Sequence, residues 1–298
     1  MNNPHLCLMP SDFLYHLDIN IPNLDDTTDI EDTYGEVKFV CVGGTKPRMC
    51  SLAKQLRCAL KIDQHLPLVD ISAAAHRYSM YKVGPVLCCS HGIGMPSCSV
   101  LLHELIKLVR YANCVDPIFL RLGTCGGLGV PPGSVVISKQ VFDGYLRNEY
   151  EMPILGECVR RPANFNPIVF NELLKCKERD DRFGICLGNT MSTNCFYEGQ
   201  ARIDGAVCCY SLEQKMCFLN KIHCMGIKNI EMEALQMAAI TYHCGIKAGA
   251  ICVTLLNRLN GDQIDITKEQ LDDFQQRPLT VAIRYIKRVL NISNCADE

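Results

Sequence analysis

Residues 118–127 read IFLRLGTCGG, an apolar run that leads into a group of glycines. The run predicts a buried β-strand over 118–122 that ends where the glycines begin. Arg121 stands inside it, and a charge in a buried strand costs free energy unless it pairs with a carboxylate or binds a ligand. Thr124 adds a hydroxyl at the carboxyl end of the strand, where α/β folds bind their ligands. The stretch therefore predicts either a buried Arg–carboxylate pair or an anion-binding strand end.

Short apolar runs and amphipathic helical patterns alternate along the rest of the chain. This alternation is typical of the α/β class with a mostly parallel central sheet. No clear linker interrupts it, so we expect one domain over residues 1–298, with an N-terminal connection (1–35) whose residues 18–35 are acidic, turn-rich and solvated. Strands are expected at 37–42, 85–90, 118–122, 134–137, 229–233 and 248–256, and helices at 97–111, 167–177, 212–223, 234–242 and 280–290.

Composition limits the possible partners. The chain has 298 residues, a formal net charge of −2 and no strongly basic half, which argues against nucleic acid or an anionic membrane surface as a partner. Its 20 cysteines include no C-x-x-C pair, so no metal site is expected. No signal peptide and no apolar stretch of ~20 residues stands out, and cysteines within apolar runs suit a reducing compartment. We therefore expect a cytoplasmic protein.

A second glycine turn lies at residues 43–48, which read GGTKPR and follow a predicted strand. Glycine lets the backbone turn tightly, and the free N–H groups of such a turn suit an anion. Arg48 adds a planar, permanently charged guanidinium. The segment is not a P-loop, because Gly-Lys-Ser/Thr is absent. Taken alone, it also fits a structural turn that carries a surface arginine.

Seven short segments, taken in their order along the chain, indicate a protein family more specifically than either glycine turn does. They are VCVGG (40–44), YKVGPVL (81–87), LHELIKL (102–108), RLGT (121–124), FYEGQAR (196–202), NIEME (229–233) and QQRP (275–278). With these segments the chain resembles the nucleoside phosphorylase-I family, most closely its uridine-cleaving members of metazoan type. The resemblance extends from about Asp12 to Leu290. It implies a three-layer α/β/α fold whose central mixed, largely parallel sheet is partly barrel-like.

The resemblance implies a phosphate site and a ribose site that are shared between two subunits. The residues that match the family's phosphate ligands are Gly44, Arg48, Arg121 and Thr124, with Arg77 reaching in from the neighbouring subunit. The residues that match the ribose contacts are Thr124, Met232 and Glu233, with His16 reaching in from the neighbour. The implied assembly is a homodimer. Without the resemblance, Glu233 also fits an acidic residue at the start of a helix.

The base contacts implied by the resemblance centre on residues 196–202. Gln200 presents one donor and one acceptor, as the N3–H of uracil and a neighbouring carbonyl require, and Arg202 can donate to a carbonyl as the base leaves. Phe196 can stack on the ring. Gly126 is expected beside the base. The family's mobile flap over the base corresponds to Leu255, Leu256, Arg258 and Ile264.

The implied reaction is uridine plus phosphate giving uracil plus ribose 1-phosphate. Positive charge builds up at the anomeric carbon, as in glycoside hydrolysis, and no protein nucleophile is needed. No cofactor is expected, since inorganic phosphate is a co-substrate. The residues expected to carry catalysis are Arg48, Arg121, Arg202 and Glu233.

Two alternatives remain open at this stage. A purine nucleoside phosphorylase of the same fold would carry an aspartate on the late loop, whereas residue 257 is Asn. A catalytically silent nucleoside-binding paralogue would have lost a phosphate arginine, the base-reading Gln or the ribose Glu. All three types are present, which favours an active uridine-cleaving enzyme.

Overall fold

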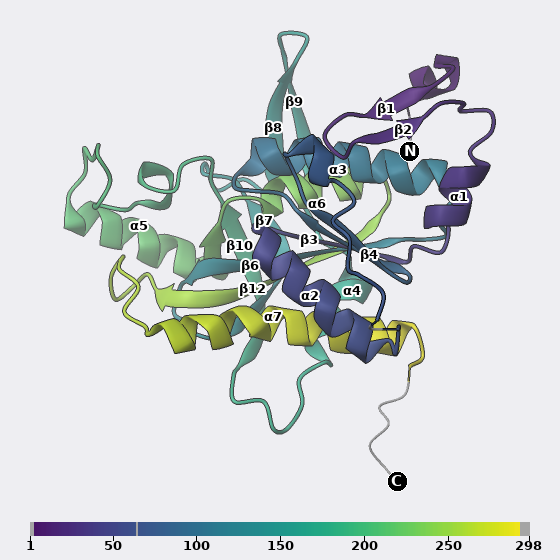
Figure 1. Ribbon diagram of the computed structural model, residues 1–298. Helices are drawn as coiled ribbons and strands as arrows, with labels where there is room; N and C mark the ends of the chain where they lie inside the picture. The colour runs from purple at the N-terminus through teal and green to yellow at the C-terminus, as the bar shows by residue number, and fades with distance from the viewer. Residues whose placement is uncertain (1–2, 64, 293–298) are drawn as a thin grey trace.

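The computed structural model describes residues 3–63 and 65–292. Its centre is an eight-stranded sheet in the order β11-β10-β7-β12-β6-β3-β5-β4, and β11 also pairs with β6. This additional pairing closes β6, β11, β10, β7 and β12 into a barrel, from which β3, β5 and β4 continue as an open sheet (Figure 1). The fold is therefore α/β, as the sequence pattern predicts, and its sheet is mixed and partly barrel-like, as the family resemblance implies.

The elements follow one another along most of the chain with short connections. The strands are β1 (Asp12–Leu14), β2 (Ile19–Ile21), β3 (Phe39–Gly43), β4 (Met80–Val83), β5 (Val86–Ser90), β6 (Ile118–Gly127), β7 (Val135–Phe142), β8 (Glu149–Ile154), β9 (Glu157–Pro162), β10 (Ile185–Ser192), β11 (Ile227–Glu231) and β12 (Lys247–Asn257). The helices are α1 (Thr28–Tyr34), α2 (Lys46–Ala59), α3 (Met95–Tyr111), α4 (Pro167–Leu174), α5 (Leu212–Cys224), α6 (Ala234–His243) and α7 (Lys268–Val289).

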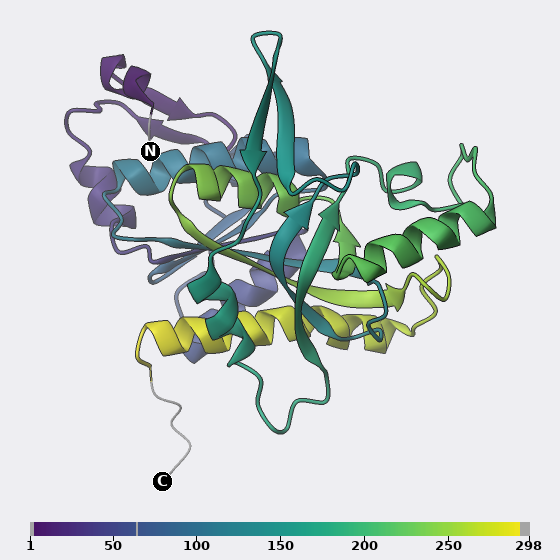
Figure 2. The same cartoon turned by 180° about the vertical axis from the view of Figure 1, so that it is seen from behind.

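Helices cover both faces of the sheet. α2 and α7 lie on one face and α3 and α6 on the other, and the β8–β9 hairpin projects away from the body (Figures 1 and 2). Most neighbouring strands are parallel, whereas β11–β6, β12–β7 and β4–β5 are antiparallel. Parallel strands bring their carboxyl ends to one edge, where a site can form. Within the described residues, no helix has both the length and the apolar character that a membrane span requires.

Strand β6 does not stop at residue 122 as predicted, but continues to Gly127. Gly126 pairs with Leu256 of β12 and with Ile230 of β11, and the second pairing closes the barrel. A Cβ on Gly126 would lie 2.9 Å from Cγ of Arg258. The glycines therefore serve close packing inside a strand, a role that their usual association with turns concealed.

Two further segments depart from prediction. Helix α7 starts at Lys268, well before the predicted residue 280, because a capping box between Thr267 and Gln270 starts it and Pro278 is accommodated in its interior. The N-terminal residues 18–35 contain β2 and α1, with Ile21 and Tyr34 buried. That part of the chain is therefore more than a solvated connection.

Candidate active site

A cavity of about 420 Å³ lies at the carboxyl ends of β3 and β11 and along β6 and β12. The predicted site residues that line it are Gly44, Arg48, Arg121, Thr124, Gly126, Phe196, Gln200, Arg202, Met232, Glu233, Leu255, Leu256 and Ile264. Residues that line it without having been predicted include Thr45, Ile93, Cys125, Ile230 and Glu231. The structure thus brings the predicted phosphate, ribose and base groups to one cavity, although their individual roles stay predictions.

One end of the cavity is formed by the turn from β3 into α2, which was predicted to bind phosphate, and this end is called the anion end. Gly44 has no side chain to fill the space beside the backbone, and Arg48 stands in the first turn of α2. Arg48 donates from Nη2 to Oε1 of Gln275 at 3.3 Å, and none of the described carboxylates lies within 4.0 Å of it. Burial, followed by the charge of Arg121, lowers the pKa of Arg48. Arg48 is therefore a partly buried cation that has no carboxylate partner among the described residues.

Arg121 connects this end to a pair of carboxylates. Only 3% of its surface is exposed, and Nη2 contacts Oε2 of Glu231 at 2.8 Å as well as Oε2 of Glu233. A Cβ on Gly123 would lie 2.5 Å from Nη1 of Arg121, so glycine is needed there for the guanidinium to fold back. The buried Arg–carboxylate pair considered from the sequence is present, and both of its carboxylates line the cavity.

Glu231 and Glu233 differ in their surroundings. Glu231 accepts the N–H groups of Glu233 and Ala234, each at 2.9 Å, and the Ser192 hydroxyl. Burial, aided by the charge of Glu233, raises the pKa of Glu231 even though Arg121 opposes it. Burial also acts on Glu233, but there Arg121 and the Gly94 N–H, which donates at 2.6 Å, outweigh it and lower the pKa. Glu233 is therefore the carboxylate held ionised, at the N-cap of α6.

The segment 196–202, which was predicted to contact the base, contributes Phe196, Gln200 and Arg202 to the cavity. The guanidinium of Arg202 lies 4.1 Å from the centre of the Phe196 ring, and its Nη1 donates to the Asp262 carbonyl at 2.8 Å. Arg258 was expected in a mobile flap over the base, but it is not among the described residues that line the cavity. It is fully buried and donates from Nη2 to the Gln200 carbonyl at 2.7 Å, so it supports the base-reading segment from behind.

Asp262, which was not predicted as a site residue, holds Arg258 in place behind the segment 196–202. Its carboxylate accepts from Nε of Arg258 at 2.9 Å and from Nζ of Lys215 at 2.6 Å. Arg258 and Asp262 have the i, i+4 spacing of an ion pair, which is a weak signal in the sequence. Lys215 lies 47 positions away, and nothing in the sequence links the two.

Replacing Asp262 with Asn should lower the free energy of unfolding by about 3–5 kcal/mol, because Lys215 and Arg258 would lose their buried counter-charge. Burial raises the pKa of Asp262, but Lys215 and Arg258 outweigh it and the pKa is lowered. This stabilisation is therefore present above the ordinary carboxyl pKa and is lost as the pH falls through the folded value. Urea unfolding of both proteins at several pH values measures it, with the exposed ion-pair residue Asp273→Asn as control. Equal stabilities at neutral pH would contradict the assignment.

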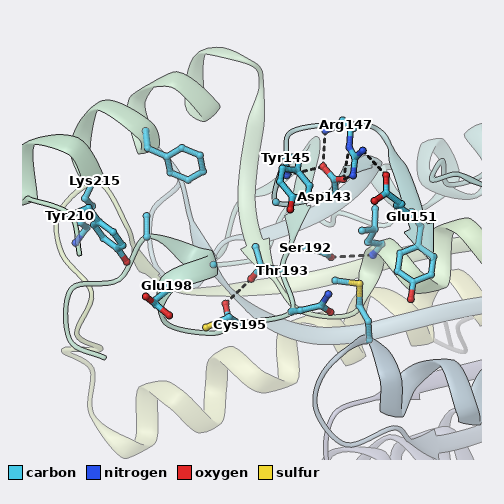
Figure 3. Close-up of a pocket in the computed structure, with 18 of the residues that line it drawn as sticks. Asp143, Tyr145, Arg147, Glu151, Ser192, Thr193, Cys195, Glu198, Tyr210 and Lys215 are labelled. Carbon is cyan, nitrogen blue, oxygen red and sulfur yellow. Dashed lines mark hydrogen bonds and ion pairs between the residues drawn. The ribbon is translucent and has the colours of Figure 1, made fainter. Parts of the chain in front are cut away.

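A second cavity, of about 650 Å³, lies on the other side of the segment 192–201 (Figure 3). Of the described residues that line it, the cations are Arg147 and Lys215, and both are in ion pairs, Arg147 with Asp143 and Glu151. In the smaller cavity Arg121 and Arg202 are also ion-paired, but Arg48 has no carboxylate partner among the described residues. An arginine without a carboxylate partner favours the smaller cavity as the site for an anionic ligand. No cluster of three or more potential metal ligands occurs among the described residues.

His16 and Arg77 do not line the cavity of their own chain. Nδ1 of His16 lies 2.6 Å from Oε1 of Glu104 on α3, and its ring is 6.2 Å from that of Tyr78. Arg77, the residue before Tyr78, is exposed. The two residues therefore lie near one another, outside the site to which the same chain contributes its other residues.

Fold and site together describe an α/β protein with one cavity that combines arginines, carboxylates and an amide in a largely apolar lining. Residues 38–291 match the family model described as the phosphorylase superfamily, and the chain belongs to this family. It is 42% identical to uridine phosphorylase 1 of Mus musculus over 97% of this chain and 92% of that protein. It is 37% identical to inactive uridine phosphorylase B of Schistosoma mansoni over 96% of this chain and 95% of that protein.

Solved structures agree with the family. A uridine phosphorylase from Schistosoma mansoni in complex with thymidine has a TM-score of 0.92 and 37% identity, with 98% of this chain and 99% of that chain covered. A structure of the Schistosoma mansoni enzyme in complex with uracil has a TM-score of 0.90 and 37% identity, with 98% and 100% covered. The fold is therefore that of the nucleoside phosphorylases. Because an inactive relative is among the similar proteins, activity has to be argued from the site residues.

Proposed function

We propose that this chain is a uridine phosphorylase, which converts uridine and phosphate reversibly to uracil and α-D-ribose 1-phosphate. One observation carries the proposal. A single cavity gathers an uncompensated Arg48, the ionised Glu233 and the Gln200–Arg202 pair, which are the groups needed for an anionic nucleophile, a sugar and a pyrimidine edge. The uridine phosphorylases among its relatives support the same reaction.

Phosphate would bind at Gly44, Arg48 and Thr124, with Arg121 behind it. Its oxygen attacks the anomeric carbon of ribose, and the bond from that carbon to N1 of uracil breaks, so that the electron pair leaves with the base. Arg202 would stabilise the negative charge on the leaving base. Holding the two reactants in line can lower the barrier by as much as ~7–11 kcal/mol, so positioning is a large part of this mechanism.

Glu233 would accept hydrogen bonds from the ribose hydroxyls while Met232 packs under the sugar. A 2′-deoxynucleoside would leave part of the buried carboxylate unsatisfied, and we expect slower turnover rather than exclusion. A related uridine phosphorylase structure that holds thymidine supports this tolerance. Gln200 would read the N3–H and neighbouring carbonyl of uracil. Hypoxanthine and guanine carry a similar N–H beside a carbonyl, but their two-ring frame places that edge farther from the sugar, so size and position would select the pyrimidine.

The remaining properties are proposed on the same basis. The assembly is a homodimer in which His16 and Arg77 reach the site of the partner, since neither lines the cavity of its own chain. No cofactor takes part, and phosphate is the co-substrate. The protein acts in the cytoplasm in pyrimidine nucleoside salvage.

The direct test mixes purified protein with uridine in the presence and absence of phosphate and follows uracil by ultraviolet absorbance. We expect uracil release only with phosphate, slower cleavage of thymidine and deoxyuridine, and no cleavage of inosine. Folded protein that releases no uracil in phosphate would refute the proposal and favour the silent paralogue. Cleavage of inosine in preference to uridine would favour a purine enzyme.

A further inference from the structure

His91 is a buried histidine beside the anion end of the cavity, and the reaction described above does not use it. Its side chain is fully buried, and neither ring nitrogen has a hydrogen-bond partner among the described residues. Its backbone, by contrast, is well held, by the Gly43 carbonyl and the Ser97 hydroxyl. A buried polar group without a partner costs about 1–3 kcal/mol, so a histidine that serves only to fill the core would be expected to have one.

The polar edge of this ring faces a niche beside Gly44. The point where a Cβ on Gly44 would stand is 3.3 Å from the Gly92 carbonyl oxygen, 3.7 Å from Nη1 of Arg48 and 3.9 Å from Cε1 of His91. Cε1 lies between the two ring nitrogens, so the nitrogen-bearing side of the imidazole is the side turned toward the niche. Because residue 44 is glycine, no side chain stands between the ring and Arg48. Gly44, Gly92 and Arg48 line the cavity, whereas His91 itself is not one of its lining residues.

The charges around His91 decide its protonation. Arg48 approaches from α2, Arg121 from β6 and Glu233 from the start of α6. Burial, followed by the charge of Arg121, lowers the pKa of His91 to about 4, while Glu233 and the nearby Gly92 backbone oppose the shift. At neutral pH the ring is therefore uncharged and has one N–H donor and one acceptor nitrogen. Such a ring can donate to an anion without adding a further positive charge beside two arginines.

We propose that His91 is a further phosphate-binding residue, whose ring N–H donates to the phosphate oxygen held beside Gly44 and Arg48. The proposal rests on the proposed function insofar as the anion is taken to be phosphate. It assigns the histidine a partner that the described part of the chain does not provide. It also gives Gly44 a purpose beyond turning the backbone, because a side chain there would separate the ring from the anion.

The kinetic test compares His91→Leu, which removes both nitrogens, with His91→Gln, which restores a donor. For His91→Leu we expect the KM for phosphate to rise about tenfold, the equivalent of ~1.4 kcal/mol, while the KM for uridine changes little. His91→Gln should recover much of the loss. His103→Leu, on the exposed side of α3, is the matched control and should behave as wild type. An unchanged phosphate KM in His91→Leu, or equal rises in both KM values, would overturn the proposal.

A measurement on the wild-type protein keeps the proposal testable if these variants do not fold. In protein labelled with ¹⁵N-histidine, the His91 ring is expected to stay neutral at about pH 5, because burial lowers its pKa to about 4. Inorganic phosphate alone, without uridine, should shift its nitrogen signals, and chloride at matched ionic strength should not. Signals that do not move at saturating phosphate would refute the contact. Because uridine is absent, this outcome is distinct from a failure to cleave uridine.

Discussion

Replacing Arg121 with Met is expected to remove most activity and to destabilise the fold in the same variant. Loss of a buried donor to a reacting anion lowers kcat by about 10²–10³-fold in comparable sites. Glu231 and Glu233 would also lose their shared cation, which should lower the free energy of unfolding by about 3–5 kcal/mol. Steady-state kinetics and urea unfolding measure the two effects separately.

The pH dependence of this variant follows from the two carboxylates. Without Arg121, burial should raise the pKa of both above the unfolded value, so the folded state binds protons more tightly than the unfolded state. The destabilisation should therefore be greatest above the raised carboxyl pKa values and shrink as the pH falls through them toward the ordinary carboxyl value. Adding Glu231→Gln should recover part of the stability and none of the activity. Arg284→Met, whose ion pair with Asp181 lies outside the cavity, is the control. An active, fully stable Arg121→Met variant would contradict this role.

Local pattern was enough to predict the class of fold, whereas the family resemblance supplied most of the cavity residues. Gly44 and Arg48 follow a strand, Arg121 and Thr124 lie in another, and Glu233 starts a helix. Each is a glycine or a polar residue next to an apolar run, which makes it visible in the sequence. Parallel strands that share an edge then bring such positions together. What pattern could not supply was the closure of the barrel, because the pairing of β6 with β11 joins segments about a hundred residues apart.

The missed residues share a physical cause. Glu231, Asp262 and Lys215 act through partners that only the folded chain brings near, and as isolated letters they resemble ordinary surface charges. Arg258 was placed in a flap over the base by the family resemblance, whereas in the structure it is completely buried and donates to the Gln200 carbonyl. In this chain the family resemblance supplied the side chains that line the cavity, whereas the charges that hold them in place were not predicted.

Arg77→Ala is expected to lower phosphorolysis by about 10²–10³-fold although the residue is exposed in its own chain. The reason is that Arg77 would contribute its charge to the phosphate site of the partner subunit. Stability should change little, because surface substitutions away from buried networks have small effects. Activity assays and urea unfolding of the purified variant test both statements. An active monomer, or full activity in Arg77→Ala, would contradict the shared site.

Mixed dimers give the sharper form of this test. Gln200→Leu damages the site of its own chain, whereas Arg77→Ala damages the site of its partner. In a dimer of one of each, both defects fall in the same site, and the other site is intact. Co-expression in equal amounts should therefore restore activity to about a quarter of the sites, since half of the dimers are mixed. Pairing Arg77→Ala with His16→Ala should restore none, because each mixed dimer then lacks one donated residue at either site. Recovery in both pairings, or in neither, would rule out donation of Arg77 and His16 across a two-fold interface.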